Sequence, residues 1–96
     1  MEKYSKVWTQ FETQSMAFVK LRMALYPEYL VRGYPMQIVI YKPTVDQNNP
    51  VKLLTIQVRS SSNKDEVGLF PKGDKEVLLI GGDAAWQVAD LIKPYL

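Results

Sequence analysis

The side chains that could do chemistry in this sequence are carboxylates, hydroxyls and amines, because its 96 residues include no histidine and no cysteine. Asp65 with Glu66, and Asp74 with Glu76, form two acidic pairs of the kind that can share acid and base roles. The serines at 60–62 offer hydroxyls, but a serine needs a neighbouring base to become a nucleophile. All of these residues lie in polar stretches typical of solvated loops. We therefore predict that the protein is not an enzyme.

The missing histidine and cysteine also exclude several classes of metal and redox site. Zinc fingers and iron–sulfur centres depend on cysteine or histidine ligands, and a Ser-His-Asp triad needs an imidazole. The acidic residues do not have the spacing of a calcium-binding loop. The sequence predicts neither a metal nor a cofactor.

An anion site is one interpretation of the segment where an apolar run opens through Gly81 and Gly82 toward a predicted helix, because free backbone N–H groups at a helix start can bind phosphate. The two glycines match neither the dinucleotide-binding nor the P-loop pattern, and Asp83 would repel an anion. A plain turn between strand and helix is the favoured interpretation.

Basic and aromatic residues are interleaved in the first 42 residues, which hold eight of the eleven aromatic side chains and six basic against three acidic ones. Tyrosine and arginine are enriched in the energetic centres of protein interfaces. We therefore expect a non-enzymatic binding protein, an inhibitor, adaptor or accessory subunit, acting on a protein partner or on a second copy of itself in a homodimer. The residues predicted to form this aromatic-basic surface are Tyr26, Tyr29, Arg32, Tyr34, Tyr41, Lys42 and Arg59.

A second function for the same surface, extended by Lys52, is the binding of single-stranded nucleic acid. Bases stack on exposed aromatic rings while lysine and arginine follow the phosphates. The net charge of +2 is modest for a nucleic-acid-binding protein. The two hypotheses differ in salt dependence, because phosphate contacts weaken steeply as salt rises.

The segment 3–25 contains no glycine or proline, and its apolar residues recur at spacings of three and four, which predicts an amphipathic helix that ends at Pro27. Trp8, Phe11 and Phe18 are expected to form the core-facing stripe of this helix. An alternative remains open, because residues 19–25 also alternate between apolar and other residues as a half-buried strand does.

Four later segments predict strands, at residues 36–41, 51–59, 67–70 and 77–80. The first two are joined by turn-forming residues and should pair antiparallel. The first, bracketed by Pro35 and Pro43, has the composition of an edge strand that could pair with a partner. Residues 77–80 are the most apolar and are expected inside the sheet.

A short helix is predicted from Ala84, capped by Asp83 and ended by Pro94, with Trp86 packed against the sheet. The complete pattern predicts an α+β fold, a small antiparallel β-sheet of about four strands packed by an N-terminal and a C-terminal helix in two layers. Residues 1–96 should form one domain. No apolar run is long enough to span a membrane, and no secretory signal is recognised, so a cytoplasmic location is expected.

Overall fold

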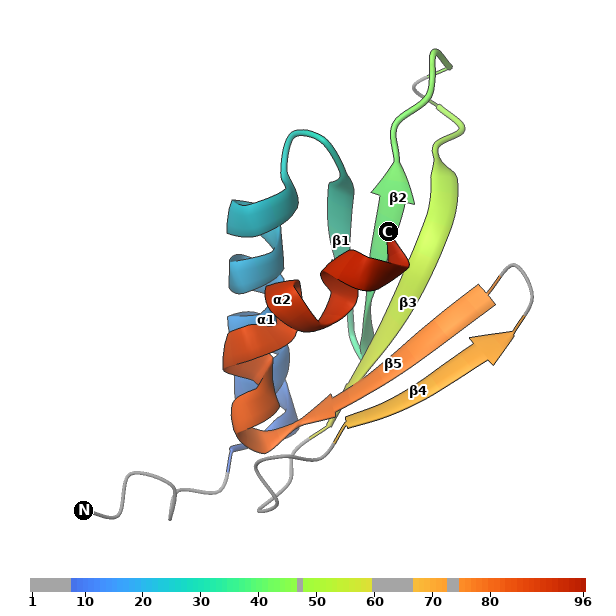
Figure 1. Cartoon of the computed structure of the whole chain (residues 1–96). Helices are drawn as coiled ribbons and strands as arrows, with labels where there is room; N and C mark the ends of the chain where they lie inside the picture. The colour runs from blue at the N-terminus through green and yellow to red at the C-terminus, as the bar shows by residue number, and fades with distance from the viewer. Residues whose placement is uncertain (1–7, 47, 60–66, 73–74) are drawn as a thin grey trace.

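The first element of the computed structural model is helix α1, Gln10–Leu25, and the structure describes residues 8–46, 48–59, 67–72 and 75–96 (Figure 1). Thr9 caps the helix, because its Oγ1 accepts a hydrogen bond of 3.0 Å from the Glu12 N–H. The helix ends at Tyr26, which precedes Pro27 and is extended, as expected for a residue before proline. A helix is therefore confirmed in this segment, but it begins at Gln10, because Trp8 and Thr9 precede it outside the helix. The alternative of a strand at 19–25 is wrong.

The face that α1 presents to the core differs from the predicted one. Its buried residues are Thr13, Ala17, Leu21 and Leu25, each four positions after the last. Phe11, two positions before this series begins, lies on another face and is 79% exposed. Trp8 and Phe18 are only partly buried. The large aromatic residues therefore lie at the margin of the core-facing row of α1 or outside it.

The sheet has five strands, β1 (Leu30–Tyr34), β2 (Gln37–Lys42), β3 (Val51–Arg59), β4 (Val67–Lys72) and β5 (Lys75–Gly81), in the order β1-β2-β3-β5-β4. Neighbouring strands pair antiparallel except β3 and β5, which are parallel, so the sheet is mixed. The strand additional to those predicted is β1. As predicted, β5 lies inside the sheet. The edge prediction for residues 36–41 is wrong, because β2 is paired on both sides and the edges are β1 and β4.

The C-terminal part is a 3-10 segment, Gly82–Gln87, followed by helix α2, Val88–Ile92, and a second 3-10 turn, Lys93–Tyr95. Gly82 has a φ of 55°, a conformation that favours glycine. The helical segment begins there, so Asp83 lies inside it and does not occupy the predicted cap position. The expected burial of Trp86 is also wrong, since the side chain is 48% exposed. Ala84, Ala85, Val88 and Ile92 are buried instead.

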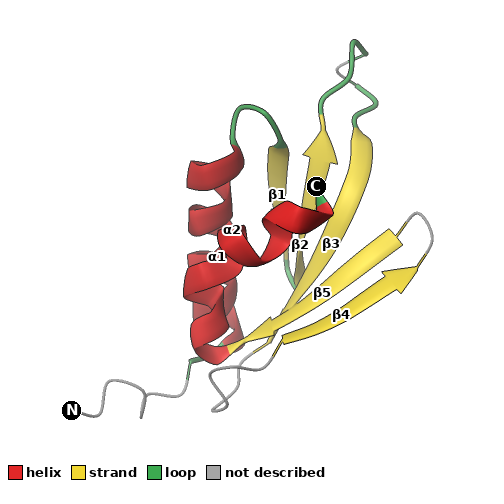
Figure 2. Ribbon diagram, in the orientation of Figure 1, coloured by secondary structure: helices red, strands yellow, loops and turns green. Residues whose placement is uncertain are grey.

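Both helices lie on one face of the sheet (Figure 2). They enclose a single core with alternate residues of β2, β3 and β5, namely Ile38, Ile40, Leu54, Ile56, Val58, Leu78 and Ile80. This two-layer α+β arrangement, with a helix toward each end of the chain, confirms the predicted fold class. Among the described residues, no helix has the length and apolar character needed to cross a membrane.

Candidate binding surface

The face of the sheet turned away from the helices, called here the open face, collects several of the predicted residues. Side chains alternate between the two faces of a strand, and Ile38 and Ile40 face the helices. Val39 and Tyr41 of β2 therefore belong to the open face. So does Arg32 of β1, which pairs with Val39.

Arg32, Tyr34 and Tyr41 form a contact cluster on this face. The Arg32 Cζ lies 5.2 Å from the centroid of the Tyr41 ring, a cation–π geometry. The Tyr34 and Tyr41 hydroxyl oxygens are 3.5 Å apart. Lys52 pairs with Tyr41 across β2 and β3, because a register shift between Ile40 and Tyr41 passes over Leu53. The cluster therefore has one guanidinium inside it and one ammonium beside it.

The two tyrosines of the cluster have shifted pKa values of opposite sign. Their hydrogen bond lowers the pKa of Tyr34, whose phenolate can accept from the Tyr41 hydroxyl, and the charges of Arg32 and Lys52 lower it further. The same hydrogen bond, together with burial, raises the pKa of Tyr41. None of the described open-face side chains on β1, β2 and β3 is acidic. The part of this face formed by β1, β2 and β3 therefore presents positive charge and hydroxyl groups.

Val39 has an exposure of only 2% although its side chain is on the open face. Its paired neighbours are Arg32 on one side and Thr55 on the other. Val39 is therefore a buried apolar position on the open face, beside Arg32 in the sheet.

The other predicted residues lie apart from the cluster. Tyr29 is partly buried and packs against the core, while Lys42 is exposed at the end of β2 opposite Val51. Tyr26 follows α1, and its ring centroid lies 5.3 Å from the Arg22 Cζ. Arg59 is exposed at the end of β3, where it pairs with Gly81. The structure thus brings together three of the seven predicted residues.

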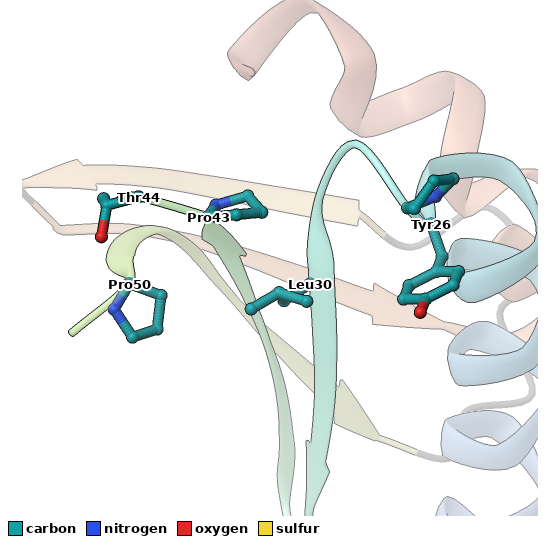
Figure 3. A pocket seen from close by; sticks show the side chains of 6 residues that line it. Tyr26, Leu30, Pro43, Thr44 and Pro50 are labelled. Atoms are coloured by element: carbon teal, nitrogen blue, oxygen red, sulfur yellow. The ribbon is translucent and has the colours of Figure 1, made fainter. Parts of the chain in front are cut away.

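Tyr26 lines a hollow of about 430 Å³ between the end of α1 and the loop that joins β2 to β3. Figure 3 shows its ring beside Leu30, with Pro43, Thr44 and Pro50 on the opposite side. Pro27 completes the lining. None of the six lining residues is charged, so this hollow has no ionic group to hold a charged ligand.

A groove between α1 and β1 was not predicted from the sequence. Its volume is about 390 Å³, and its lining residues are Phe11, Gln14, Ser15, Phe18, Gly33, Tyr34 and Pro35. The Gln14 side-chain amide donates a hydrogen bond to the Tyr34 carbonyl. One feature of the sequence could have indicated this groove. Thr13, Ala17, Leu21 and Leu25 follow one another at four-residue spacing, and a helix that buries this row leaves Phe11 on a different face.

A third aromatic contact joins Trp8 and Trp86, whose ring centroids are 6.2 Å apart in an edge-on arrangement. The Lys20 Nζ lies 5.4 Å from the Trp86 ring centroid. These contacts connect α1 and the residue Trp8 before it with the C-terminal 3-10 segment.

The acidic and serine candidates for catalysis at 60–66 and at Asp74 lie outside the described residues, and the side chain of Glu76 is not described. Among the described residues, no group of three or more acidic, histidine or cysteine side chains could hold a metal ion. No protein-family model, curated protein or solved structure matches this chain.

Proposed function

We propose that this protein is a non-enzymatic binding protein that recognises an acidic segment of a partner protein through the open face of its sheet. The observation that carries the proposal is the cluster of Arg32, Tyr34 and Tyr41 with Lys52 beside it. Arginine and tyrosine supply much of the binding energy at protein interfaces. Contact with the Tyr41 ring restrains the Arg32 guanidinium, which reduces the entropy lost on binding a carboxylate.

The charge pattern favours an acidic partner. Arg32 and Lys52 contribute positive charge to the described open face of β1–β3, where no acidic side chain opposes it. An approaching carboxylate would be attracted by both cations and would accept hydrogen bonds from the guanidinium.

Single-stranded nucleic acid is the second candidate, since Arg32, Lys52 and Arg59 spread positive charge across β1 and β3. Base stacking needs an accessible ring face, however, and Arg32 lies over the ring of Tyr41. This arrangement is better suited to carboxylates than to stacked bases.

The proposal can be tested by fluorescence anisotropy with a labelled peptide in which valine alternates with glutamate. Arg32→Ala and Lys52→Ala should each weaken binding by about three- to tenfold. Lys93→Ala is the matched control, because it removes one exposed positive charge from the C-terminal turn. An equal loss in Lys93→Ala would refute the assigned surface.

A labelled mixed-sequence single-stranded DNA serves as the second probe. If the DNA binds more tightly than the peptide, with a steep salt dependence that Arg32→Ala reduces, the nucleic-acid function replaces the proposed one.

A further inference from the structure

We propose that the edge of β1 and the groove beside it bind an extended segment of a partner as an added strand, with an acidic residue opposite Arg32 and apolar residues on either side. This inference rests on the proposed function for the acidic character of the partner, and it adds the place and the geometry of binding. Its three supports are the free edge, the groove and the position of Arg32.

The backbone of β1 is available for strand addition because β1 is the first strand of the sheet and, among the described strands, pairs with β2 alone. Tyr34 pairs with Gln37 across a two-residue turn, the position of the i to i+3 hydrogen bond of a tight turn. Hydrogen-bonded and non-bonded pairs alternate along an antiparallel ladder. The N–H and C=O groups of Val31 and Gly33 therefore point away from β2, toward the free edge.

The groove determines which side chains an added strand should have opposite Val31 and Gly33. Both residues are on the helix side of β1, and residues opposite them in a new strand would have side chains on the same side. There they would meet Phe18, which is close enough that a Cβ on Gly33 would lie 3.4 Å from its ring. Phe11, 79% exposed, forms the outer part of the groove. These positions of the partner should be apolar.

Arg32 determines the charge expected for the central residue of the added strand, between the two apolar residues. An added strand would place this residue directly opposite Arg32 on the open face, where a carboxylate is favourable and a cation is not. The recognised segment is thus apolar, acidic, apolar.

Arg32 also argues against a second copy of this chain as the occupant. A symmetric pairing of two β1 strands that used the outward groups of Val31 and Gly33 in both copies would centre on Arg32. The two arginines would then face each other in the closely spaced pair of the ladder, and like charges directly opposite are destabilising.

The paired segment is short, because β1 offers few outward backbone groups beyond Val31 and Gly33. At one end, Pro35 follows Tyr34 and has no N–H to donate to an added strand. At the other end, the Tyr29 N–H donates to the Leu25 carbonyl at 2.9 Å. Main-chain pairing should therefore extend over Val31 to Gly33, and affinity should be modest.

The first experiment is an NMR titration of isotope-labelled protein with three short peptides that differ only at their centre. The centres are valine–glutamate–valine, valine–lysine–valine, and the acidic sequence with its three central nitrogens methylated. The acidic peptide should shift the amide resonances of Val31 and Gly33. Binding should weaken by about tenfold with lysine and be lost on methylation, which removes the donors of the added strand.

The outcomes separate the two proposals. If the methylated peptide binds as well as the unmethylated one, or if Tyr41 and Lys52 respond while Val31 and Gly33 do not, strand addition is wrong and the open-face function stands. If no resonance responds at millimolar peptide, both proposals are wrong. Single-stranded DNA that shifts Val31 and Gly33 in place of the peptide would overturn the choice of a protein segment.

The second experiment compares Gly33→Pro with Gly33→Ala. Among the described glycines, a positive φ is found at Gly82 and not at Gly33. Residues other than glycine can therefore adopt the backbone conformation of Gly33. Proline removes the outward N–H and is tolerated on edge strands, whereas alanine keeps the N–H. We expect about tenfold weaker peptide binding for Gly33→Pro and a change within about threefold for Gly33→Ala. Equal affinities would overturn the proposal, as would a dimer, detected by ultracentrifugation, that Gly33→Pro dissociates.

Circular dichroism checks that each variant folds. If Gly33→Pro does not fold, the methylated peptide decides the question on the unaltered protein. Phe11→Ser then tests the groove, and a loss of affinity for the acidic peptide is expected because the apolar wall is removed.

Discussion

Thr9 and Thr13 of α1 should respond in opposite directions when each is replaced by valine. Thr13 is fully buried, and its Oγ1 has no hydrogen-bond partner among the described residues. An unpaired buried hydroxyl costs about 1–3 kcal/mol, and valine has a similar shape and helix propensity. Thr13→Val should therefore raise the free energy of unfolding by about 1 kcal/mol.

Thr9→Val is the matched comparison, because this threonine is exposed and its Oγ1 accepts the Glu12 N–H at 3.0 Å. Losing the cap should lower the free energy of unfolding by about 1 kcal/mol. Urea denaturation followed by circular dichroism measures both changes, and each should shift Tm by roughly 4–8 °C for a domain of this size. If Thr13→Val destabilises the protein by more than about 0.5 kcal/mol, the hydroxyl has a partner and the reasoning is refuted.

Three further variants test the packing and the electrostatics. Leu21→Ala should lower the free energy of unfolding by about 2–5 kcal/mol because Leu21 is fully buried. Phe11→Ser should change the free energy of unfolding by no more than about 0.5 kcal/mol because Phe11 is exposed, and thermal denaturation compares the two variants. Trp86→Ala should lower it by about 1–2 kcal/mol, less than full burial would give, since half of the side chain is exposed; a loss above about 4 kcal/mol in urea denaturation would contradict this placement. In alkaline titration followed by tyrosinate absorbance, Tyr34 should ionise below its ordinary pKa of 10.0 and before Tyr41. Tyr41→Phe should raise the pKa of Tyr34 by removing the hydroxyl that donates to its phenolate, and an unchanged titration would exclude the hydrogen bond as the cause of the lowered pKa.

The C-terminal end of α1 could be predicted from the sequence, but its start at Gln10 and its orientation could not. Continuous helix-forming residues and the proline after Tyr26 define the described helix and its end. The sequence-based prediction placed the largest apolar residues, Trp8, Phe11 and Phe18, on the buried face of the helix. In the structure, the smaller residues Thr13 and Ala17 are fully buried against the sheet, whereas Phe11 is exposed.

The missing strand has a similar explanation. Gly33 and Pro35 together suggest a turn, yet Gly33 lies within β1 and the turn is formed by Pro35 and Met36. The absent side chain at Gly33 leaves room for Phe18 beside the strand. The parallel pairing of β3 with β5 could not be predicted from the sequence either. The strand that follows β3 in the chain is β4, yet the strand that pairs with β3 is β5.

The binding surface was predictable only where residues share a strand face. Arg32 and Tyr34, two positions apart, were bound to lie on one side once β1 formed. Lys52 joins them through the register shift near Tyr41, an irregularity that an alternating pattern does not contain. Tyr29 was predicted to be at the surface, but packing of the connection between α1 and β1 against the core partly buries it.

A charge exchange at Arg32 tests whether the open face and the β1 edge bind one ligand together. The side chain of Arg32 belongs to the open face, while the backbone of its neighbours Val31 and Gly33 forms the free edge. If the acidic residue of an added strand lies opposite Arg32, then Arg32→Glu should prefer the valine–lysine–valine peptide by about tenfold, which NMR titration measures. Lys93→Glu is the control, because Lys93 is exposed in the C-terminal turn, and it should keep the original preference for glutamate. If Arg32→Glu weakens the acidic peptide without gaining the basic one, the carboxylate binds elsewhere on the open face and the proposed register is wrong.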